Sequence, residues 1–256
     1  SMHPGVREAV TLRLLGPLLV TQLNDQGQWQ GEIALRRKDG RVVNELLSIS
    51  HLQGEEGDAS HYVAVLVDIT YLKQAEEAYR NRANHDPLTR LPNRNLLQER
   101  LQKGLVRSRR NSEKFALLFV DLDGFKAVND GLGHEMGDIV LRTLAARLVD
   151  CVRQGDTVAR YGGDEFVMLV EGEQDSDWLG QTAERIIEAV RRPIQGHGRP
   201  ICITASVGIA LYPEDGNSAE LLLRRADLAM YQAKHAGKDQ FRFYRDCPSA
   251  DEGDLP

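Results

Sequence analysis

An unbroken apolar run that ends at an acidic residue constrains the fold of this chain more than any other feature. Residues 115–120 (FALLFV) are all apolar, and Asp121 follows them directly. A run without alternation predicts a strand that is buried on both faces of a sheet. Helices must then cover both faces, and Asp121 must stand at the end of the strand.

Around this strand, hairpin and helix patterns alternate. Residues 157–161 and 166–170 predict two strands joined by the turn Gly162-Gly163-Asp164-Glu165. Helices are expected at residues 94–109, from Gly137 or Asp138 to 152, at 176–191 and from Asn217 or Ser218 to Gly237, and single strands at 201–211 and 241–244. This interleaving predicts an α/β (α+β) sandwich with a mixed, largely antiparallel central sheet flanked by helices.

The first 70 residues are β-rich. Strands are expected at residues 29–37 and 42–49 around Asp39-Gly40, which is a strong hairpin signal, and at residues 61–67. A helix over residues 71–83 follows. Its heptad positions hold Ile69, Leu72, Glu76, Tyr79 and Ala83. With Glu76 in the seam, this helix is either a single surface helix or a short parallel coiled coil between two copies.

Charge and cysteine usage exclude several classes of protein. The net charge of −6 gives no general attraction for DNA or RNA, although a nucleotide can still bind through a cation. Cys151, Cys202 and Cys247 match no zinc or disulfide spacing, which favours a reduced cytosolic setting. The apolar run at residues 12–20 is too short and broken to span a membrane, and no signal peptide is predicted.

Acidic residues gather at the predicted edge of the sheet. Asp121 ends the buried strand, Asp123 can point the same way, and Asp164 and Glu165 occupy the hairpin turn. If these strands are neighbours, the carboxylates repel one another unless cations neutralise them. Hard oxygen ligands suit Mg²⁺ and the metal-assisted transfer of phosphoryl groups. The alternative is a solvated hairpin tip beside a loop aspartate.

Neighbouring residues are suited to a nucleotide. The main-chain N–H groups of Gly124 and Phe125 lie near a helix start, where phosphate is favoured, and Lys126 adds a cation. Asn129 and Asp138 can read the edge of a guanine, whose N1–H and N2–H₂ suit a carboxylate. Lys234 and Lys238, four residues apart, can meet a polyphosphate.

Several motifs in one order resemble the GGDEF family, the diguanylate cyclases. Residues 161–166 (YGGDEF) carry its signature. The resemblance covers about residues 84–244 and includes HDPLTRLPNR (85–94), FVDLDGFKAVND (119–130), GHEMGD (133–138) and RADLAMYQAKHAGKD (225–239). It implies that two protomers, each with one GTP, meet with two-fold symmetry. Each ribose 3′-hydroxyl attacks the α-phosphate of the other GTP, giving cyclic di-GMP and two pyrophosphates.

The resemblance also implies a role for each matching residue. Asp121, the Leu122 carbonyl and Asp164 would hold Mg²⁺ or Mn²⁺, with Glu165 as a further ligand. Asp164 would be the catalytic base for the 3′-hydroxyl, unless coordination by the metal does this work; the sequence leaves both open. The guanine would be read by Asn129 and Asp138, and the phosphates would be held by Lys126, Lys234 and Lys238, where the family often has Arg for Lys238.

A second site resembles the family's inhibitory product site. It is the Arg-x-x-Asp pattern of Arg153 and Asp156, with five residues between it and Gly162. Arg153 can fork onto a guanine edge or a phosphate, and Asp156 can accept from guanine. Cyclic di-GMP bound there would inhibit the enzyme.

The N-terminal part, over about residues 25–70, resembles the C-terminal half of a PAS sensor domain. We therefore expect Ser1-Met2 to be a remnant of expression, residues 3–70 a partial PAS-like segment, 71–84 a signalling-helix linker, 85–246 the GGDEF domain and 247–256 a disordered tail. Two other interpretations are a non-catalytic receptor for GTP or cyclic di-GMP, and a PAS portion that mainly mediates dimerisation or docking. A bacterial, cytosolic homodimer is expected.

Overall fold

The computed structural model describes residues 26–52, 61–172, 175–196 and 198–247. The chain divides into two compact units, residues 1–80 and 81–256. The predictions for the expression remnant, for the start of the PAS-like segment and for residues 248–256 fall outside the described residues. Among the described residues, no helix is long and apolar enough to cross a membrane.

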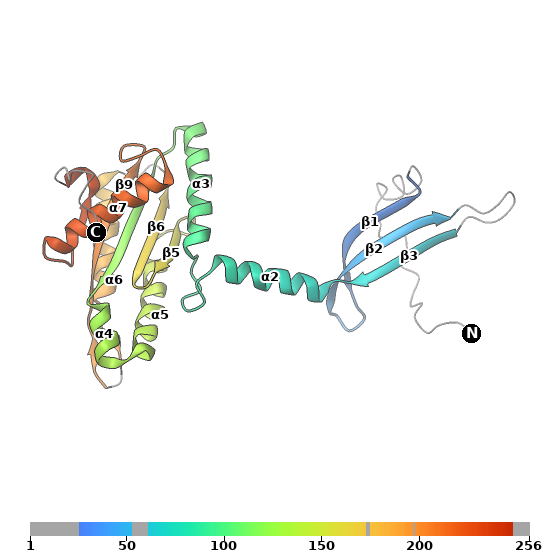
Figure 1. Ribbon diagram of the computed structural model, residues 1–256, viewed down its shortest axis with the longest axis horizontal. Coiled ribbons are helices and arrows are strands. Elements are labelled where there is room, and N and C mark those ends of the chain that lie inside the picture. The colour runs from blue at the N-terminus through green and yellow to red at the C-terminus, as the bar shows by residue number, and fades with distance from the viewer. Residues whose placement is uncertain (1–25, 53–60, 173–174, 197, 248–256) are drawn as a thin grey trace. The chain divides into compact units, whose positions relative to one another are not determined.

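The first unit holds a three-stranded antiparallel sheet, drawn from blue to cyan in Figure 1. Its strands are β1 (Gln28–Arg36), β2 (Val42–Leu52) and β3 (His61–Asp68). The predicted hairpin is confirmed, because Arg36 pairs with Val42 across the turn. One face buries Leu47 and Ile49, and the other exposes the valines of β3.

Helix α2 (Thr70–Asn84) follows β3. Its start is fixed to the first sheet, because the main-chain N–H of Asn44 donates to Thr70 Oγ1 at 3.0 Å. Three large apolar side chains on α2 are exposed, Tyr71, Leu72 and Tyr79. The choice between a surface helix and a coiled coil stays a prediction.

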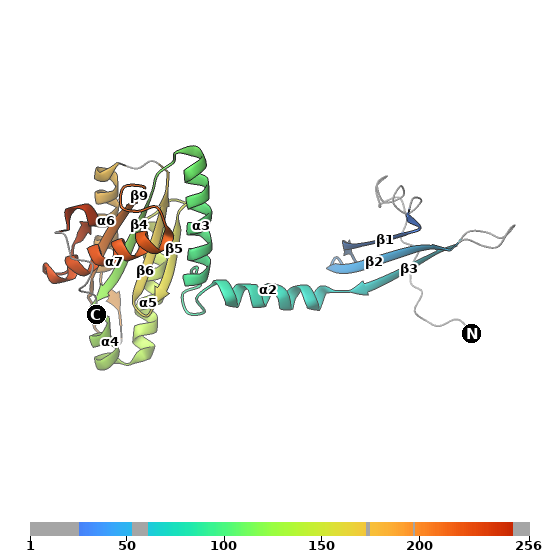
Figure 2. The same cartoon turned by 45° about the horizontal axis from the view of Figure 1, so that its top comes forward.

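The second unit is built on a five-stranded sheet in the order β10-β9-β4-β6-β5. The strands are β4 (Phe115–Asp123), β5 (Thr157–Gly162), β6 (Glu165–Glu171), β9 (Thr204–Tyr212) and β10 (Phe241–Phe243). Strand β10 runs parallel to β9, and the other neighbours are antiparallel. The mixed, largely antiparallel sheet is thus as predicted, with β4 at its centre (Figure 2).

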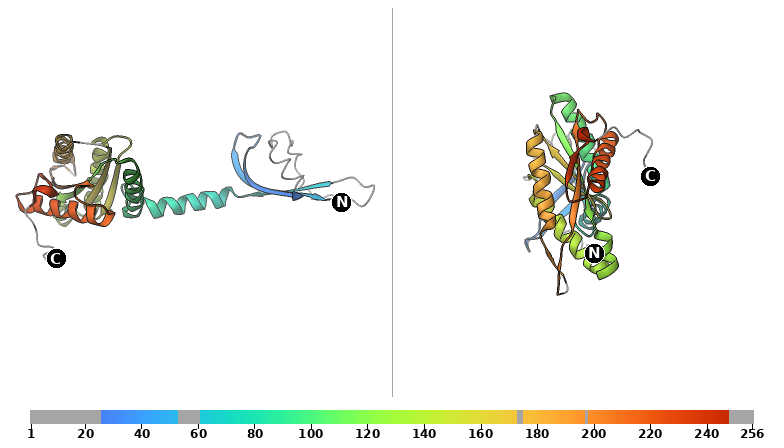
Figure 3. Two further views of the ribbon diagram at one scale, coloured as in Figure 1. Left: turned by 90° about the horizontal axis from the view of Figure 1, so that it is seen from above. Right: turned by 90° about the vertical axis from the view of Figure 1, so that its left-hand side faces the viewer.

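Helices cover both faces of this sheet, as the apolar β4 run predicts (Figure 3). Helices α3 (Arg94–Asn111) and α7 (Ala219–His235) bury Leu117 and Phe119 on one face. Helices α5 (His134–Asp150) and α6 (Ser176–Arg191) bury Leu118 and Val120 on the other. Side chains alternate along β4, so Asp121 and Asp123 face the α7 side.

Three expected boundaries were wrong. Strand β4 does not end at 120 but continues through Asp123, because residues 115–123 all pair with β9. Helix α5 starts at His134, and a separate helix α4 (Phe125–Leu132) precedes it; Gly133, with φ 84°, separates the two. The strand expected over residues 201–211 is split, because its first part, β8 (Pro200–Ile201), pairs instead with β7 (Ile194–Gln195).

Candidate active site

The acidic residues meet at one edge of the five-stranded sheet. Asp121 on β4 lies opposite Glu165 on β6. The main-chain N–H of Leu122 donates to the Asp164 carbonyl at 3.3 Å, which ties the hairpin turn to the end of β4. The fold therefore brings the pair Asp121 and Leu122 close to the pair Asp164 and Glu165, although more than 40 positions separate the two pairs in the sequence.

Burial and neighbouring negative charges raise the pKa values of two of these carboxylates, Asp121 and Glu165. Asp121 is only 6% exposed; burial raises its pKa, and the charges of Asp164 and Asp123 raise it further, against the opposing effect of Lys234. Burial also raises the pKa of Glu165, and Asp121, Asp227 and Asp164 add to the rise. The charged form of each group is therefore disfavoured, as expected for acids gathered around a place for a cation.

Helix α7 supplies the compensating charge. Lys234 Nζ lies 2.7 Å from Asp121 Oδ2, so this lysine, expected at the phosphates, is ion-paired with the strand-end aspartate. About two turns earlier on the same helix, Asp227 lies close enough to Glu165 to raise the pKa of Glu165. Burial raises the pKa of Asp227 as well. The sequence analysis missed Asp227, which stands seven residues before Lys234 on the same helix face.

The donors at this edge are carboxylate and carbonyl oxygens, which Mg²⁺ and Mn²⁺ prefer. Within the described ranges, no three His, Cys, Asp or Glu side chains are arranged to hold a metal ion. These oxygen ligands are chemically suited to a hard divalent cation. The raised pKa values of Asp121 and Glu165 indicate that nearby positive groups do not fully compensate their negative charges.

Asp123, two residues beyond Asp121, has other partners. Its carboxylate accepts from Thr204 Oγ1 and Ser206 Oγ, each at 2.9 Å. Both hydroxyls come from the neighbouring strand β9. Asp123 thus shares the face of Asp121, but protein donors already satisfy its oxygens.

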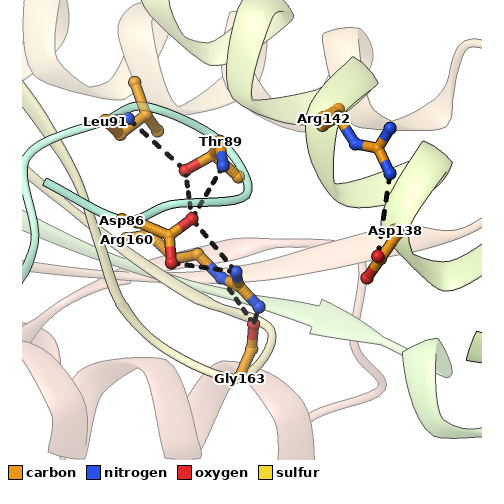
Figure 4. A network of polar contacts seen from close by, with 7 residues as sticks. All are labelled: Asp86, Thr89, Leu91, Asp138, Arg142, Arg160 and Gly163. Atoms are coloured by element: carbon orange, nitrogen blue, oxygen red, sulfur yellow. Dashed lines mark hydrogen bonds and ion pairs between the residues drawn. The ribbon is translucent and has the colours of Figure 1, made fainter. Parts of the chain in front are cut away.

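The two predicted guanine-reading residues lie on adjacent helices, α4 and α5. A Cβ atom on Gly137 would lie 2.0 Å from Asn129 Oδ1, so only glycine lets α5 pass so close to Asn129. Asp138 follows Gly137 directly and is half-exposed, with Arg142 Nη2 at 3.6 Å from its Oδ2 (Figure 4). The fold therefore places Asn129 against Gly137, the residue that precedes Asp138.

The protein groups that are predicted to bind the phosphates lie in different surroundings. Gly124 caps α4 with φ 81°, and as a glycine it leaves the first N–H groups, including that of Phe125, uncovered by its own side chain. Lys126 is exposed on α4. Lys238 is exposed in the turn after α7. Of the three lysines, only Lys234 is close to the acids by a measured contact.

The Arg-x-x-Asp pattern forms a tight turn before β5. Asp156 Oδ2 accepts the Arg153 main-chain N–H at 2.9 Å, and its Oδ1 accepts that of Glu171 at 3.1 Å. The Arg153 guanidinium lies over the Trp178 ring, 4.6 Å from the centroid. Asp156 thus shapes the turn, and Arg153 is an exposed residue whose guanidinium lies against Trp178. Trp178 was missed because it lies on α6, 25 positions away.

One further contact reaches the hairpin turn from the segment after α2. Arg160 Nη1 lies 3.1 Å from both carboxylate oxygens of Asp86, and Arg160 Nε and Nη2 donate to the Gly163 carbonyl at 3.0 and 2.7 Å (Figure 4). Burial by itself raises the pKa of Asp86, but hydrogen bonds from Thr89 and the ion pair with Arg160 outweigh it and lower the pKa. The residue before Asp164 is therefore anchored to the start of the unit.

Comparison with known protein families identifies the domain that contains these residues. Residues 83–240 match the family model described as "Diguanylate cyclase, GGDEF domain". The chain belongs to the GGDEF family. The hairpin turn, the end of β4, and the motifs on α5 and α7 are thus parts of one GGDEF domain.

Relatives and solved structures agree with this assignment. The chain is 44% identical over 181 residues, or 71% of its length, to the bifunctional diguanylate cyclase/cyclic di-GMP phosphodiesterase MucR of Pseudomonas aeruginosa, of which it covers 26%. It matches the GGDEF domain of TpbB (YfiN) from the same species with 40% identity and a TM-score of 0.61, covering 62% of this chain and 94% of that one.

A second structure is the coiled coil and GGDEF domain of DgcB from Caulobacter crescentus in complex with c-di-GMP. It matches with 28% identity and a TM-score of 0.63, over 68% of this chain and 93% of that one. The chain spans about a quarter of the length of the curated relatives that it matches first.

Proposed function

We propose that this chain is a diguanylate cyclase, which condenses two GTP into cyclic di-GMP and two pyrophosphates. The observation that carries the proposal is the assembly of Asp121, Asp164 and Glu165 at one edge, beside Lys234. Non-catalytic members of a family are expected to lose the acids of the active site, whereas this chain keeps them. The names of the relatives MucR and TpbB support the same activity.

Each residue would act on one part of GTP. Asp138 would accept from guanine N1–H and N2–H₂, and the Asn129 amide would donate to or accept from the guanine edge. The first N–H groups of α4, with Lys126, Lys234 and Lys238, would hold the phosphates. Asp121, the Leu122 carbonyl, Asp164 and Glu165 would hold Mg²⁺ or Mn²⁺. The bound metal would polarise the α-phosphate. Asp164, at the tip of the hairpin, would accept the proton of the attacking 3′-hydroxyl.

The reaction would need two copies of the chain. One domain offers one GTP site, so the attacking hydroxyl must come from a GTP held by a second protomer facing the first. We expect α2 to raise the local concentration of that protomer, as part of the linker between a partial PAS-like segment and the GGDEF domain. The Arg153 and Asp156 turn would bind the product, cyclic di-GMP, with the Arg153 guanidinium as the fork.

Incubation of the pure protein with GTP and Mg²⁺, followed by mass spectrometry of the products, tests the proposal. Cyclic di-GMP and pyrophosphate in a 1:2 ratio are expected, at a rate that rises more steeply than linearly with enzyme concentration. Bound but unconverted GTP or cyclic di-GMP would instead identify a receptor. Strictly linear rates down to nanomolar enzyme would mean a preformed tight dimer.

A further inference from the structure

Lys238 lies in the turn that links α7 to β10 and has an uncommon backbone conformation. Lys238 has φ 63° and Asp239 has φ 54°, so two consecutive residues with side chains occupy the left-handed region. Such conformations are costly and persist only where surrounding contacts impose them. The contacts that hold this turn therefore decide where the ammonium group of Lys238 stands.

Asp123 makes one of these contacts from the end of β4. The main-chain N–H of Asp239 donates to Asp123 Oδ2 at 3.2 Å. The same carboxylate accepts from Thr204 Oγ1 and Ser206 Oγ on β9. Asp123 is 8% exposed, so these three donors fix its position inside the protein. The turn is thus hydrogen-bonded to the central strand that ends in the active-site acids.

Arg191, the last residue of α6, makes the second contact. Its Nε lies 2.9 and 2.8 Å from the two carboxylate oxygens of Asp239, and Nη2 lies 2.7 Å from Oδ2. Asp239 is therefore held by its main chain on one side and by its side chain on the other. On the α7 side, the N–H of Lys238 donates to the Ala233 carbonyl at 3.1 Å.

We propose that Asp123 is a positioning residue for the substrate phosphates and not a metal ligand. Through the N–H of Asp239 it fixes the turn in which Lys238 stands, and Arg191 holds the same turn from α6. Its oxygens are occupied by two hydroxyls and one N–H, whereas Asp121 faces an ammonium group and other acids. This inference rests on the proposed function in one respect, the contact between Lys238 and GTP.

The test measures binding of the α,β-methylene analogue of GTP, which cannot lose pyrophosphate, in the presence of Mg²⁺. Asp123→Asn replaces one acceptor oxygen by an NH₂ group that cannot accept. We expect the analogue to bind roughly three- to tenfold more weakly, with the half-saturating Mg²⁺ concentration unchanged. GMP, which has a single phosphate, should lose less affinity than the analogue.

A double-mutant cycle separates positioning from general damage. In a Lys238→Ala background, Asp123→Asn should change the affinity for the analogue by less than about twofold, because the group that it positions is gone. Arg191→Gln, a surface change, should act in the same direction as Asp123→Asn and should also lose its effect in that background. Arg191→Gln therefore tests the proposal even if Asp123→Asn does not fold.

Asp215→Asn is the matched control. Asp215 is 5% exposed and accepts the Leu211 N–H at 2.8 Å, so it also holds a turn, but at the opposite end of β9. We expect a lower Tm for this variant with unchanged affinity for the analogue. A matching fall in Tm without loss of affinity in Asp123→Asn would show a purely structural aspartate and overturn the proposal.

Two other results would also overturn it. A rise in the half-saturating Mg²⁺ concentration in Asp123→Asn, at full affinity for the analogue under saturating Mg²⁺, would make Asp123 a metal ligand. Unchanged binding in Lys238→Ala would remove the group that Asp123 is said to position. A parent protein that makes no cyclic di-GMP would reject the proposed function, while binding of the analogue would still decide the role of Asp123.

Discussion

The two ends of the β5–β6 hairpin hold carboxylates under opposite conditions. At the turn, Glu165 lies among other acids, and burial with their repulsion raises its pKa. At the far end, Asp156 accepts two main-chain N–H groups, from Arg153 and Glu171. At the turn, the negative charge of Glu165 is only partly compensated by nearby groups. At the far end, the carboxylate of Asp156 is engaged in hydrogen bonds that hold the fold.

The difference separates two uses of an acidic residue. A carboxylate with protein donors on its oxygens stabilises the folded state, and its loss exposes unsatisfied N–H groups. A carboxylate crowded by like charges costs stability and gains it back only when a cation arrives. Substitutions at the two ends should therefore move activity and stability in different directions, which makes the comparison testable.

The largest effect is expected at the turn. Asp164→Ala and Asp121→Ala should each lower the rate of cyclic di-GMP formation by roughly a thousandfold or more, because the metal loses a ligand. The fold should remain intact, as circular dichroism can check. Asp150→Ala, an exposed change at the end of α5, is the control and should keep full activity. Unchanged turnover in Asp164→Ala would remove the turn from the active site.

The next effect is expected beside the turn, on α5. Asp138→Ala leaves the guanine N1–H and N2–H₂ without a charged acceptor, which should weaken GTP binding by about ten- to a hundredfold. Selectivity for GTP over ATP should fall with it, as competition binding measures. Arg142→Ala removes only the neighbour of Asp138 and should retain the selectivity. If Asp138→Ala still rejects ATP as the parent does, the base is read elsewhere.

A smaller effect is expected at the far end. The strand β5 spans about 17 Å between the Arg153 turn and the GGDEF turn. A ligand at Arg153 therefore cannot occupy the GTP site of the same protomer. Arg153→Ala should weaken inhibition by cyclic di-GMP about tenfold or more and leave the initial rate nearly unchanged. Initial rates at several GTP concentrations should show non-competitive inhibition in the parent; competitive inhibition would assign the product to the GTP site.

The smallest effects are on stability and have opposite signs. Asp156→Ala should lower the free energy of unfolding by about 1–3 kcal/mol, because the N–H groups of Arg153 and Glu171 lose their acceptor. Glu165→Gln should raise the Tm of the protein in EDTA by a few degrees at most, about 1–3 °C. Calorimetry of both variants beside the parent measures the two shifts.

The gain in Glu165→Gln should depend on pH. The pKa of Glu165 is higher in the folded chain than in the unfolded chain, so the folded chain binds this proton more tightly. That stabilisation is complete below the unfolded-state pKa and is lost as the pH rises through the folded-state pKa. Glu165→Gln removes this loss, so its advantage over the parent should grow from acidic to neutral pH. A constant or shrinking advantage would contradict the crowded-acid interpretation.

Local patterns in the sequence predicted most helices and strands of the second unit, but they could not predict contacts between distant segments. The apolar run before Asp121 predicted a strand buried on both faces, but its place at the centre of the sheet and its pairing with the strand of Glu165 came from the structure. The bond between Asp86 and Arg160 joins residues 74 positions apart, and that between Ser206 and Asp123 joins residues 83 positions apart. Neither pair has a periodic signal, because tertiary packing alone brings them together.

The sequence also could not distinguish the roles of Asp121 and Asp123. Asp121 and Asp123 occupy equivalent places on one face of β4, and alternation treats them alike. They differ in their partners: the Lys234 ammonium group lies against Asp121, whereas two hydroxyls and the Asp239 N–H donate to Asp123. The side chains of the neighbouring helix and strand therefore give the two carboxylates different partners.

The contact between Lys234 and Asp121 makes this lysine a tethered counterion with two possible partners. In the proposed active site, a cation that binds Asp121 would compete with the ammonium group of Lys234, which would then be free to meet the phosphates. Nucleotide that draws Lys234 away leaves Asp121 open to the cation in the same manner. Each ligand therefore removes an obstacle to the other, and by linkage the affinity gained is equal in both directions. Magnesium and GTP should accordingly load this protein as a cooperative pair, with either one weak by itself.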